Sequence, residues 1–257
     1  MKKQNTLRFT TDVLLYPILF VLVLWIVFWV ELRFQVRFNK YGIRPGSIEG
    51  LRGILFGPFV HGSVKHLFNN SIPLLVLSMA LLYFYRNISW KVLLYGALLT
   101  GLLTWLIGRP ANHIGASGVI YMLVAFLFLK GILSRHIRLT ALSLIVVFLY
   151  GGLWWYVMPI EPGISWEGHL SGFIVGILFA LIFKSNIAKP LKYRWEQQSY
   201  TPDNDPFMKA FDEKGNFIGY TPEVETEEAS ESSDAEASSG KVTVKYTYNS
   251  STKKDNN

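Results

Sequence analysis

Three short clusters of polar residues, at positions 61–70, 113–121 and 168–172, stand where long apolar segments begin. The residues in them that could do chemistry are His66, Asn70, Ser117 and His169. A polar residue inside a membrane is costly to bury and usually marks a functional site. Because a serine hydroxyl becomes a nucleophile when a base such as histidine lies beside it, this set of residues predicts acyl-transfer chemistry.

The spacing of these residues indicates that they can meet at one depth. If the N-terminus is cytoplasmic, the second, fourth and sixth apolar segments, which carry the clusters, all run from the outer face inwards. His66 and Asn70 are i and i+4 and therefore share one face of a helix. Ser117 and His169 each lie within about the first turn of their segments. Three helices would thus present these four residues near the outer face.

Glycines beside the serine and the second histidine predict close contact between the fourth and sixth helices. Gly168, Gly172 and Gly176 form a Gly-x-x-x-Gly-x-x-x-Gly ridge, and Gly115 and Gly118 flank the serine. Small residues of this kind let helix backbones approach closely. If the sixth helix packs on the fourth there, the histidine reaches the serine hydroxyl.

Ser117 and His169 are expected to act as a dyad without an acid. Glu167 is two residues from His169 and so lies on a different face of the helix. Attack by a serine on a carbonyl also requires hydrogen-bond donors for the oxyanion. The backbone N–H of Ser117, at a helix N-terminus, is free to donate. The His66 ring and the Asn70 amide could supply the other donors.

Each cluster also has an ordinary structural interpretation. A serine in a transmembrane helix often bonds to its own backbone, a glycine ridge is often only a packing surface, and an asparagine at a helix start is often a cap. His61 and His136 are expected to be solvated interfacial residues, and His113 a loop residue. The convergence of three clusters at one depth favours the catalytic interpretation over these.

Six apolar segments predict an all-α membrane protein with six transmembrane helices. Residues 13–30 form an eighteen-residue run interrupted only by Pro17, which is long enough to span hydrocarbon and too long for a typical signal peptide. Several of the other runs are short alone but reach about twenty residues once a polar first turn is added. These runs are Ile72–Tyr85, Val92–Ile107, Ala116–Leu129, Leu139–Met158 and Leu170–Phe183.

Lysine and arginine residues orient the six helices. If both termini are cytoplasmic, the inner segments carry twelve of these residues and the outer loops carry seven, and this excess on the inside favours that orientation. We expect a multi-pass protein of the cell (inner) membrane. The first outer loop, about Glu31 to Lys65, is an exception because it holds six of the seven. It is glycine-rich with interspersed apolar residues, and we expect it to be structured and to rest partly in the interface.

The composition divides the chain into three parts. Only five of the 18 acidic residues lie in residues 1–194. The expected organisation is a short cytoplasmic N-terminus at 1–11, a six-span domain at 12–185 and a largely disordered, acidic and serine-rich cytoplasmic tail at 186–257. The tail could bind an unknown partner or be merely solvated, and its residues 241–248 could form an isolated strand.

The sequence also excludes several classes of function. The absence of cysteine excludes disulfides, thiolate metal sites and cysteine nucleophiles. No zinc, P-loop or dinucleotide-binding pattern occurs. The net charge of +7 lies mostly beside apolar runs, where it fits membrane topology better than nucleic-acid binding. We therefore expect no metal, no other cofactor and no nucleic-acid partner.

Taken together, the three clusters resemble the rhomboid family of intramembrane serine proteases over roughly residues 10–185. The short motifs that carry the resemblance are His-x-x-x-Asn, Gly-x-Ser-Gly with a later tyrosine, and His-x-x-Gly, which correspond to His66 and Asn70, to Gly115, Ser117 and Gly118 with Tyr121, and to His169 and Gly172. Each motif is weak alone, but their order on six spans is specific. One departure is Leu51-Arg52, where the best-known bacterial members carry Trp-Arg.

The resemblance implies a six-helix rhomboid bundle with a water-filled active-site cavity open to the outside. In it Ser117 would be the nucleophile and His169 the general base and acid. His66, Asn70 and the Ser117 N–H would stabilise the oxyanion, and Tyr121 would pack under the His169 ring. Substrates would be transmembrane proteins in the lipid bilayer, cleaved within or beside a transmembrane helix.

Two rival functions belong to other classes. A non-proteolytic family member would bind transmembrane helices and guide their trafficking or degradation, but such proteins usually lose the serine or the histidine, and both are present here. A channel or transporter is less favoured because the predicted bundle lacks an intramembrane acid apart from Asp12. Fluorophosphonate labelling of Ser117 would separate the enzyme from both rivals.

Overall fold

The computed structural model describes residues 9–134, 136–161, 163–184, 193, 195, 198–201, 205 and 207–219. Within these residues the regular structure is helical, and the β pairing amounts to two isolated bridges. The chain divides into two compact units, residues 1–191 and 192–257. The apolar helices and the candidate site belong to the first unit.

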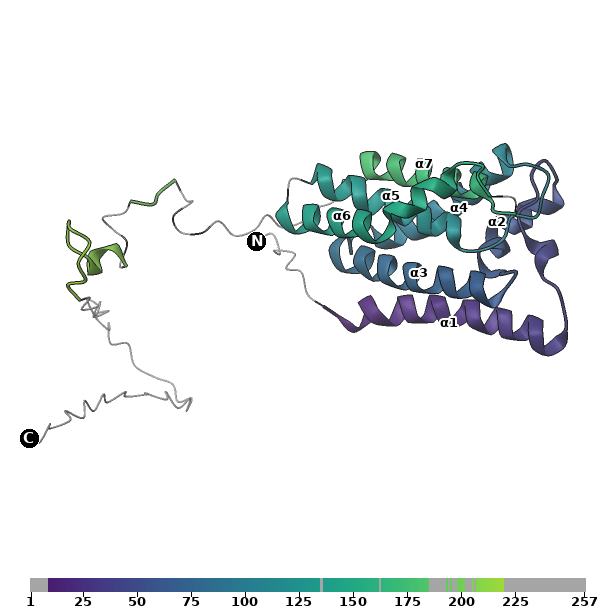
Figure 1. The fold of residues 1–257 in the computed structure, drawn as a ribbon, viewed down its shortest axis with the longest axis horizontal. Helices are drawn as coiled ribbons and strands as arrows, with labels where there is room; N and C mark the ends of the chain where they lie inside the picture. The colour runs from purple at the N-terminus through teal and green to yellow at the C-terminus, as the bar shows by residue number, and fades with distance from the viewer. Residues whose placement is uncertain are drawn as a thin grey trace, which may run out of the picture. The chain divides into compact units, whose positions relative to one another are not determined.

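The first unit is built on six apolar helices (Figure 1). The helices are α1 (Thr11–Phe34), α3 (Val64–Phe84), α4 (Ser89–Ile107), α5 (Ser117–Leu133), α6 (Ile137–Tyr150) and α7 (Trp166–Ile182). Shorter turns complete the unit: η1 (Asn39–Tyr41), η2 (Glu49–Arg52), α2 (Gly53–Phe56), η3 (Gly57–Phe59) and η4 (Gly151–Val157). The predicted all-α class is confirmed.

Four segments are long and apolar enough to cross a membrane, namely α1, α3, α4 and the continuous stretch of α6 with η4. The helices α5 and α7 have 17 residues each and are shorter than expected. At 1.5 Å per residue such a helix is about 26 Å long, against about 30 Å of hydrocarbon. Helix α5 is short because the polar residues before Ser117 stay in a loop, whereas α7 does add a polar first turn ahead of Leu170 and ends at Ile182.

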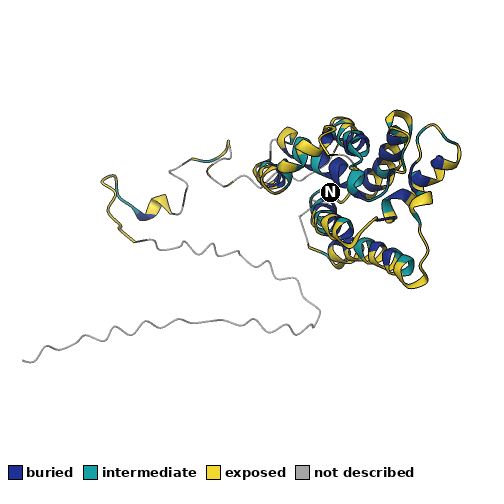
Figure 2. Ribbon diagram, turned by 45° about the vertical axis from the view of Figure 1, so that its right-hand side comes forward, coloured by how far each residue is buried: buried dark blue, intermediate teal, exposed yellow. Residues whose placement is uncertain are grey.

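Helix α5 occupies the middle of the bundle. It contacts α7, α6, α3 and α4, and Met122, Leu123 and Phe126 on it are fully buried. The outward faces of the surrounding helices are exposed, as Figure 2 shows in yellow, and many of their residues are apolar; Phe148 on α6 is 87% exposed. Apolar surface of this extent suits contact with lipid.

Glycines let α5 and α7 meet backbone to backbone. A Cβ atom added at Gly172 would overlap the carbonyl oxygen of Gly118, and one added at Gly176 would overlap that of Met122. A Cβ atom at Gly118 would in turn lie 3.2 Å from the carbonyl oxygen of Gly168. The sixth apolar helix therefore packs closely on the fourth at the glycine ridge.

Polar contacts also stabilise the end of the bundle at which α5 and α7 terminate. The Lys130 Nζ donates to the carbonyl oxygens of Ala180, at 2.9 Å, and Phe183, which satisfies the C-terminus of α7. Arg86 forms an ion pair with Asp12 at 2.7 Å. This pair ties the turn between α3 and α4 to the start of α1.

The first outer loop is structured, as expected, through the turns η1, η2, α2 and η3. Within it the Arg52 guanidinium lies 5.0 Å from the centre of the Tyr41 ring and donates to the carbonyl oxygen of Lys40 at 3.1 Å. Leu55 and Phe56 are exposed. Their contact with the membrane interface stays a prediction.

The second unit contains a small turn that the composition of the tail does not predict. The 3-10 turn η7 (Met208–Ala210) leads into an antiparallel bridge between Phe211 and Phe217. Asp212 Oδ1, in the connection, accepts the backbone N–H of Asn216 at 2.7 Å. Aspartate and asparagine favour such turns, so the presence of these two residue types could have predicted this one.

The other expectations for the tail fall on residues 220–257. The acidic, serine-rich segment and the possible strand at 241–248 both lie outside the described residues. The boundaries of the three expected parts of the chain stay predictions.

The glycine contact between α5 and α7 can be tested by adding one methyl group. Gly172→Ala should lower the thermal midpoint in detergent micelles, because the nearest atoms are backbone and neither helix can give way. Overpacking of this kind costs about 1–3 kcal/mol. Gly152→Ala is the matched control, since no atom lies within 4 Å of its added Cβ. Equal thermal midpoints for the two variants would contradict the packing described here.

Candidate active site

Ser117 and His169 lie beside each other near the N-terminal ends of α5 and α7. Ser117 is the first residue of α5 and His169 the fourth of α7. The His169 Nε2 lies 3.0 Å from the Ser117 Oγ, which is a hydrogen-bonding distance. His169 is buried and Ser117 is half-buried.

A backbone carbonyl sets the protonation of the His169 ring. Its Nδ1 lies 2.8 Å from the carbonyl oxygen of Tyr156 in η4. Because a carbonyl oxygen can only accept, Nδ1 must carry the proton and donate it. The Nε2 then has a free lone pair facing the Ser117 hydroxyl. A general base needs this tautomer. The group that orients the histidine is here a main-chain carbonyl rather than an acid.

Tyr121 holds the His169 ring from one side. The two rings are stacked, with centroids 4.2 Å apart and planes 8° from parallel. The Tyr121 hydroxyl donates to the carbonyl oxygen of Leu153 at 2.7 Å. Both Leu153 and Tyr156 belong to η4, so this short turn fixes the histidine and the tyrosine together.

Two side-chain nitrogens converge beside the backbone that leads to Ser117. A Cβ atom added at Gly115 would lie 2.7 Å from the His66 Nε2 and 3.4 Å from the Asn70 Nδ2. The Asn70 Nδ2 is buried and has no hydrogen-bond partner among the described residues. Gly115 also has a φ of +102°, which a residue with a side chain rarely adopts. Position 115 therefore favours glycine both because of the neighbouring side chains and because of the positive φ. The Asn70 Nδ2, a donor without a partner among the described residues, lies next to the space that a side chain at this position would fill.

A cavity of about 700 Å³ opens onto these groups. Its volume lies within the usual range of ligand sites. It reaches the surface, because its lining includes the exposed residues Lys65 and Glu161. The candidate residues that line it are His66, Asn70, Ser117, Tyr121 and His169.

The structure brings every candidate site residue named from the sequence into one region. The glycines at 115, 118 and 172 adjoin the cavity residues, and their chemical roles, like those of the others, remain predictions. The Tyr156 carbonyl was missed, because a main-chain contact leaves no signature in residue type. No group of three or more His, Asp and Glu side chains within the described residues is placed to hold a metal ion.

Two histidines expected to be solvated are buried instead. His61 is 2% exposed, because its ring packs against that of His66 at 5.0 Å and its Nδ1 donates to the Phe59 carbonyl oxygen at 3.3 Å. Burial, and secondarily the neighbouring His66, lowers the pKa of His61 to about 4, so this ring is neutral at pH 7. His136 is 8% exposed, at the start of α6. His113 lies in a loop, as expected, but is also buried.

Comparisons with known proteins identify a family for this chain. The family model described as Rhomboid domain matches residues 49–186, which include α3 to α7 and leave α1 outside. An uncharacterized protein of Mycobacterium tuberculosis (strain ATCC 25618 / H37Rv) is 37% identical over 177 residues, which cover 65% of this chain and 73% of that protein. An uncharacterized protein of Mycobacterium leprae (strain TN) is 34% identical over 179 residues, covering 65% and 69%.

The stacked tyrosine generates a prediction about the reactivity of Ser117 toward a fluorophosphonate. Tyr121→Phe keeps the stack and loses one hydrogen bond, worth about 1 kcal/mol, so labelling should slow roughly fivefold. Tyr121→Leu loses the stack as well, and a misplaced base should slow labelling by about a hundredfold.

Tyr85→Leu is the matched control for this series. Tyr85 is also buried, with its ring centroid 5.4 Å from that of Phe126, at the C-terminal end of α3 away from His66 and Asn70. Its replacement should lower stability and leave the labelling rate of folded protein unchanged. If Tyr85→Leu and Tyr121→Leu slow labelling equally, Tyr121 has no specific effect on His169.

Proposed function

The chain belongs to the rhomboid family, whose members are generally intramembrane serine proteases, and from this premise we propose that it is an active serine endopeptidase of transmembrane segments. The observation that carries the proposal is the 3.0 Å contact between Ser117 Oγ and His169 Nε2, with the Nδ1 proton held by the Tyr156 carbonyl. Family membership and the apolar helices make the chain a multi-pass membrane protein.

In the first half-reaction the Ser117 oxygen attacks the scissile carbonyl carbon while its proton passes to His169 Nε2. The imidazolium that forms keeps its Nδ1 proton bonded to the Tyr156 carbonyl oxygen. His169 then gives the Nε2 proton to the leaving amine nitrogen, and the C–N bond breaks. The product is an ester between Ser117 and the N-terminal part of the substrate.

In the second half-reaction water cleaves this ester. His169 Nε2, neutral again, takes a proton from the water as its oxygen attacks the ester carbonyl. The same nitrogen returns a proton to the Ser117 oxygen as the acyl–oxygen bond breaks. The cavity beside the dyad has room for several water molecules, which supports hydrolysis in an otherwise apolar bundle.

The oxyanion of both tetrahedral intermediates forms toward His66 and Asn70. The Asn70 Nδ2 is buried and unpartnered among the described residues, and the His66 Nε2 lies beside it at Gly115. The backbone N–H of Ser117, at the start of α5, has no acceptor within the helix. Preformed donors of this kind stabilise the transition state without reorganising.

The remaining features of the proposal concern placement. We place the protease domain at residues 12–185, with both termini in the cytoplasm and the dyad near the outer face of the inner membrane. The twelve-to-seven distribution of Lys and Arg supports this orientation. The polar tail at 186–257 then lies in the cytoplasm, where it is available to a partner.

The dyad predicts that Ser117→Ala and His169→Ala abolish cleavage of a fluorescent transmembrane substrate in liposomes, because each removes the nucleophile or its base. Ser78→Ala is the control. Ser78 is a buried helical serine whose hydroxyl bonds to the carbonyl oxygen of Leu74, the ordinary role of such a residue. Its loss should leave cleavage unchanged.

Turnover by purified Ser117→Ala would contradict the assignment. If folded wild-type protein neither cleaves several substrates nor accepts a fluorophosphonate, a protein that binds transmembrane helices without cutting them becomes the better reading of the fold.

The oxyanion site predicts that Asn70→Ala and His66→Ala lower kcat by about 10²–10³-fold with little change in KM, because the lost contact exists mainly in the transition state. Asn70→Asp is the sharper variant, since it preserves size but replaces the donor with an acceptor. It should be at least as slow as Asn70→Ala at neutral pH. Activity of Asn70→Asp near that of wild type would remove Asn70 from the oxyanion site.

A further inference from the structure

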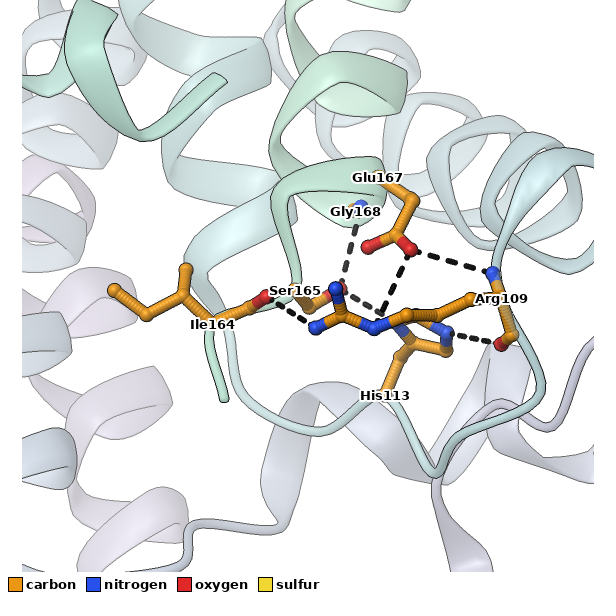
Figure 3. A network of polar contacts seen from close by, with 6 residues as sticks. All are labelled: Arg109, His113, Ile164, Ser165, Glu167 and Gly168. Atoms are coloured by element: carbon orange, nitrogen blue, oxygen red, sulfur yellow. Dashed lines mark hydrogen bonds and ion pairs between the residues drawn. The ribbon is translucent and has the colours of Figure 1, made fainter. Parts of the chain in front are cut away.

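A buried carboxylate near the dyad is paired with an arginine from another loop. The side chain of Glu167, on the first turn of α7, is 1% exposed. Its Oε1 lies 3.5 Å from the Arg109 Nε and accepts the Arg109 backbone N–H at 3.3 Å (Figure 3). The Arg109 guanidinium also donates to the carbonyl oxygen of Ile164 at 2.7 Å. One arginine therefore holds both the start of α7 and the loop before it.

A second link joins the same two segments. The His113 Nε2 lies 3.0 Å from the carbonyl oxygen of Arg109, so this nitrogen donates. The His113 Nδ1 is then an acceptor, and the Ser165 hydroxyl donates a hydrogen bond to it at 2.6 Å. Ser165 is the N-cap of α7, where its oxygen accepts the backbone N–H of Gly168 at 3.3 Å. Figure 3 shows both links converging on the first turn of α7.

Each side of this arrangement leads directly to a member of the dyad. The loop at 108–116 runs into Ser117, and the segment from Ser165 to Glu167 runs into His169. The glycine contact sets the distance between the helix axes. Ser117, however, is the first residue of its helix, so the orientation of its backbone N–H depends on the preceding loop. The loop therefore has to be fixed separately from the helices.

We propose that Arg109, Glu167, His113 and Ser165 form a positioning clasp that sets the angle and distance between Ser117 and His169. This inference rests on the proposed function. No side chain of these four residues hydrogen-bonds to the side chain of Ser117 or His169 among the described residues, and the direct link is the His169 backbone N–H, which donates to the carbonyl oxygen of Ser165 at 3.2 Å. The four residues therefore act through the loop and the start of the helix. A buried carboxylate that loses its arginine is left uncompensated, which should displace the first turn of α7.

The burial of Glu167 supports this role over an ordinary surface ion pair. Exposed pairs contribute little, whereas removal of one partner of a buried pair is strongly disruptive. Arg86 and Asp12 form a comparison pair in the same bundle, at the end of α1 away from the dyad, with both side chains partly exposed. The two arginines can receive the same substitution.

The experiment compares full-length Arg109→Gln, Arg109→Lys, Ser165→Ala and Arg86→Gln with wild type in liposomes. Its readouts are kcat and KM for a fluorescent transmembrane substrate and the rate of fluorophosphonate labelling. A displacement of about 1 Å in a catalytic pair can slow reaction by about a hundredfold, and a partial loosening should slow it less. We expect Arg109→Gln to lower kcat and labelling about tenfold, with KM within about twofold of wild type.

The other variants separate positioning from general stability. Arg109→Lys keeps the charge and should recover part of the loss. Ser165→Ala cuts the second link without leaving a buried charge, so it tests the clasp even if Arg109→Gln does not fold, and should lower kcat and labelling by severalfold. Arg86→Gln should match wild type in both.

Wild-type rates in Arg109→Gln, or in Ser165→Ala if that is the variant that folds, would overturn the clasp while leaving the protease assignment intact. Equal losses of kcat in Arg109→Gln and Arg86→Gln would also overturn it, because the effect would then be one of bundle stability. Folded wild type that is neither labelled nor active would overturn both the clasp and the proposed function.

Discussion

The direct contact between the backbones of α5 and α7 is the constraint on which the rest of the site depends. A side chain at Gly172 would overlap the Gly118 carbonyl, so the two helices can approach this far only without one. That approach places the fourth residue of one helix 3.0 Å from the first residue of the other. It also leaves both helix N-termini at the same cavity, where free N–H groups and side-chain donors are available without further rearrangement.

Main-chain carbonyl oxygens accept several of the hydrogen bonds that hold the side chains of this bundle in place. The Tyr156 carbonyl fixes the tautomer of His169, the Leu153 carbonyl holds Tyr121, and the carbonyls at the end of α7 are satisfied by Lys130. In an apolar environment a peptide group is a polar partner that carries no net charge to be desolvated. The one buried carboxylate near the site, Glu167, has an arginine beside it.

Sequence reasoning found the features that depend on residue type and spacing. The apolar runs predicted the six helices, and the glycine ridge predicted the α5–α7 contact, because each follows from hydropathy or from small side chains. It overestimated the lengths of α5 and α7, because α5 starts only after the positive φ of Gly115 and α7 ends at Ile182. It also missed the burial of His61 and the role of the Tyr156 carbonyl, because both arise from how loops fold back on the helices.

The turn η4 hydrogen-bonds to the site through two carbonyl oxygens, those of Leu153 and Tyr156. The hydrogen bond to His169 Nδ1 therefore does not depend on which side chain stands at position 156. A signature built from residue identities would record the serine, the histidine and the glycines, and would not record these two carbonyl groups. In the proposed mechanism the group that orients the base is thus inherited as backbone shape, so the competence of a homologue depends on the path of this turn as well as on its residue identities.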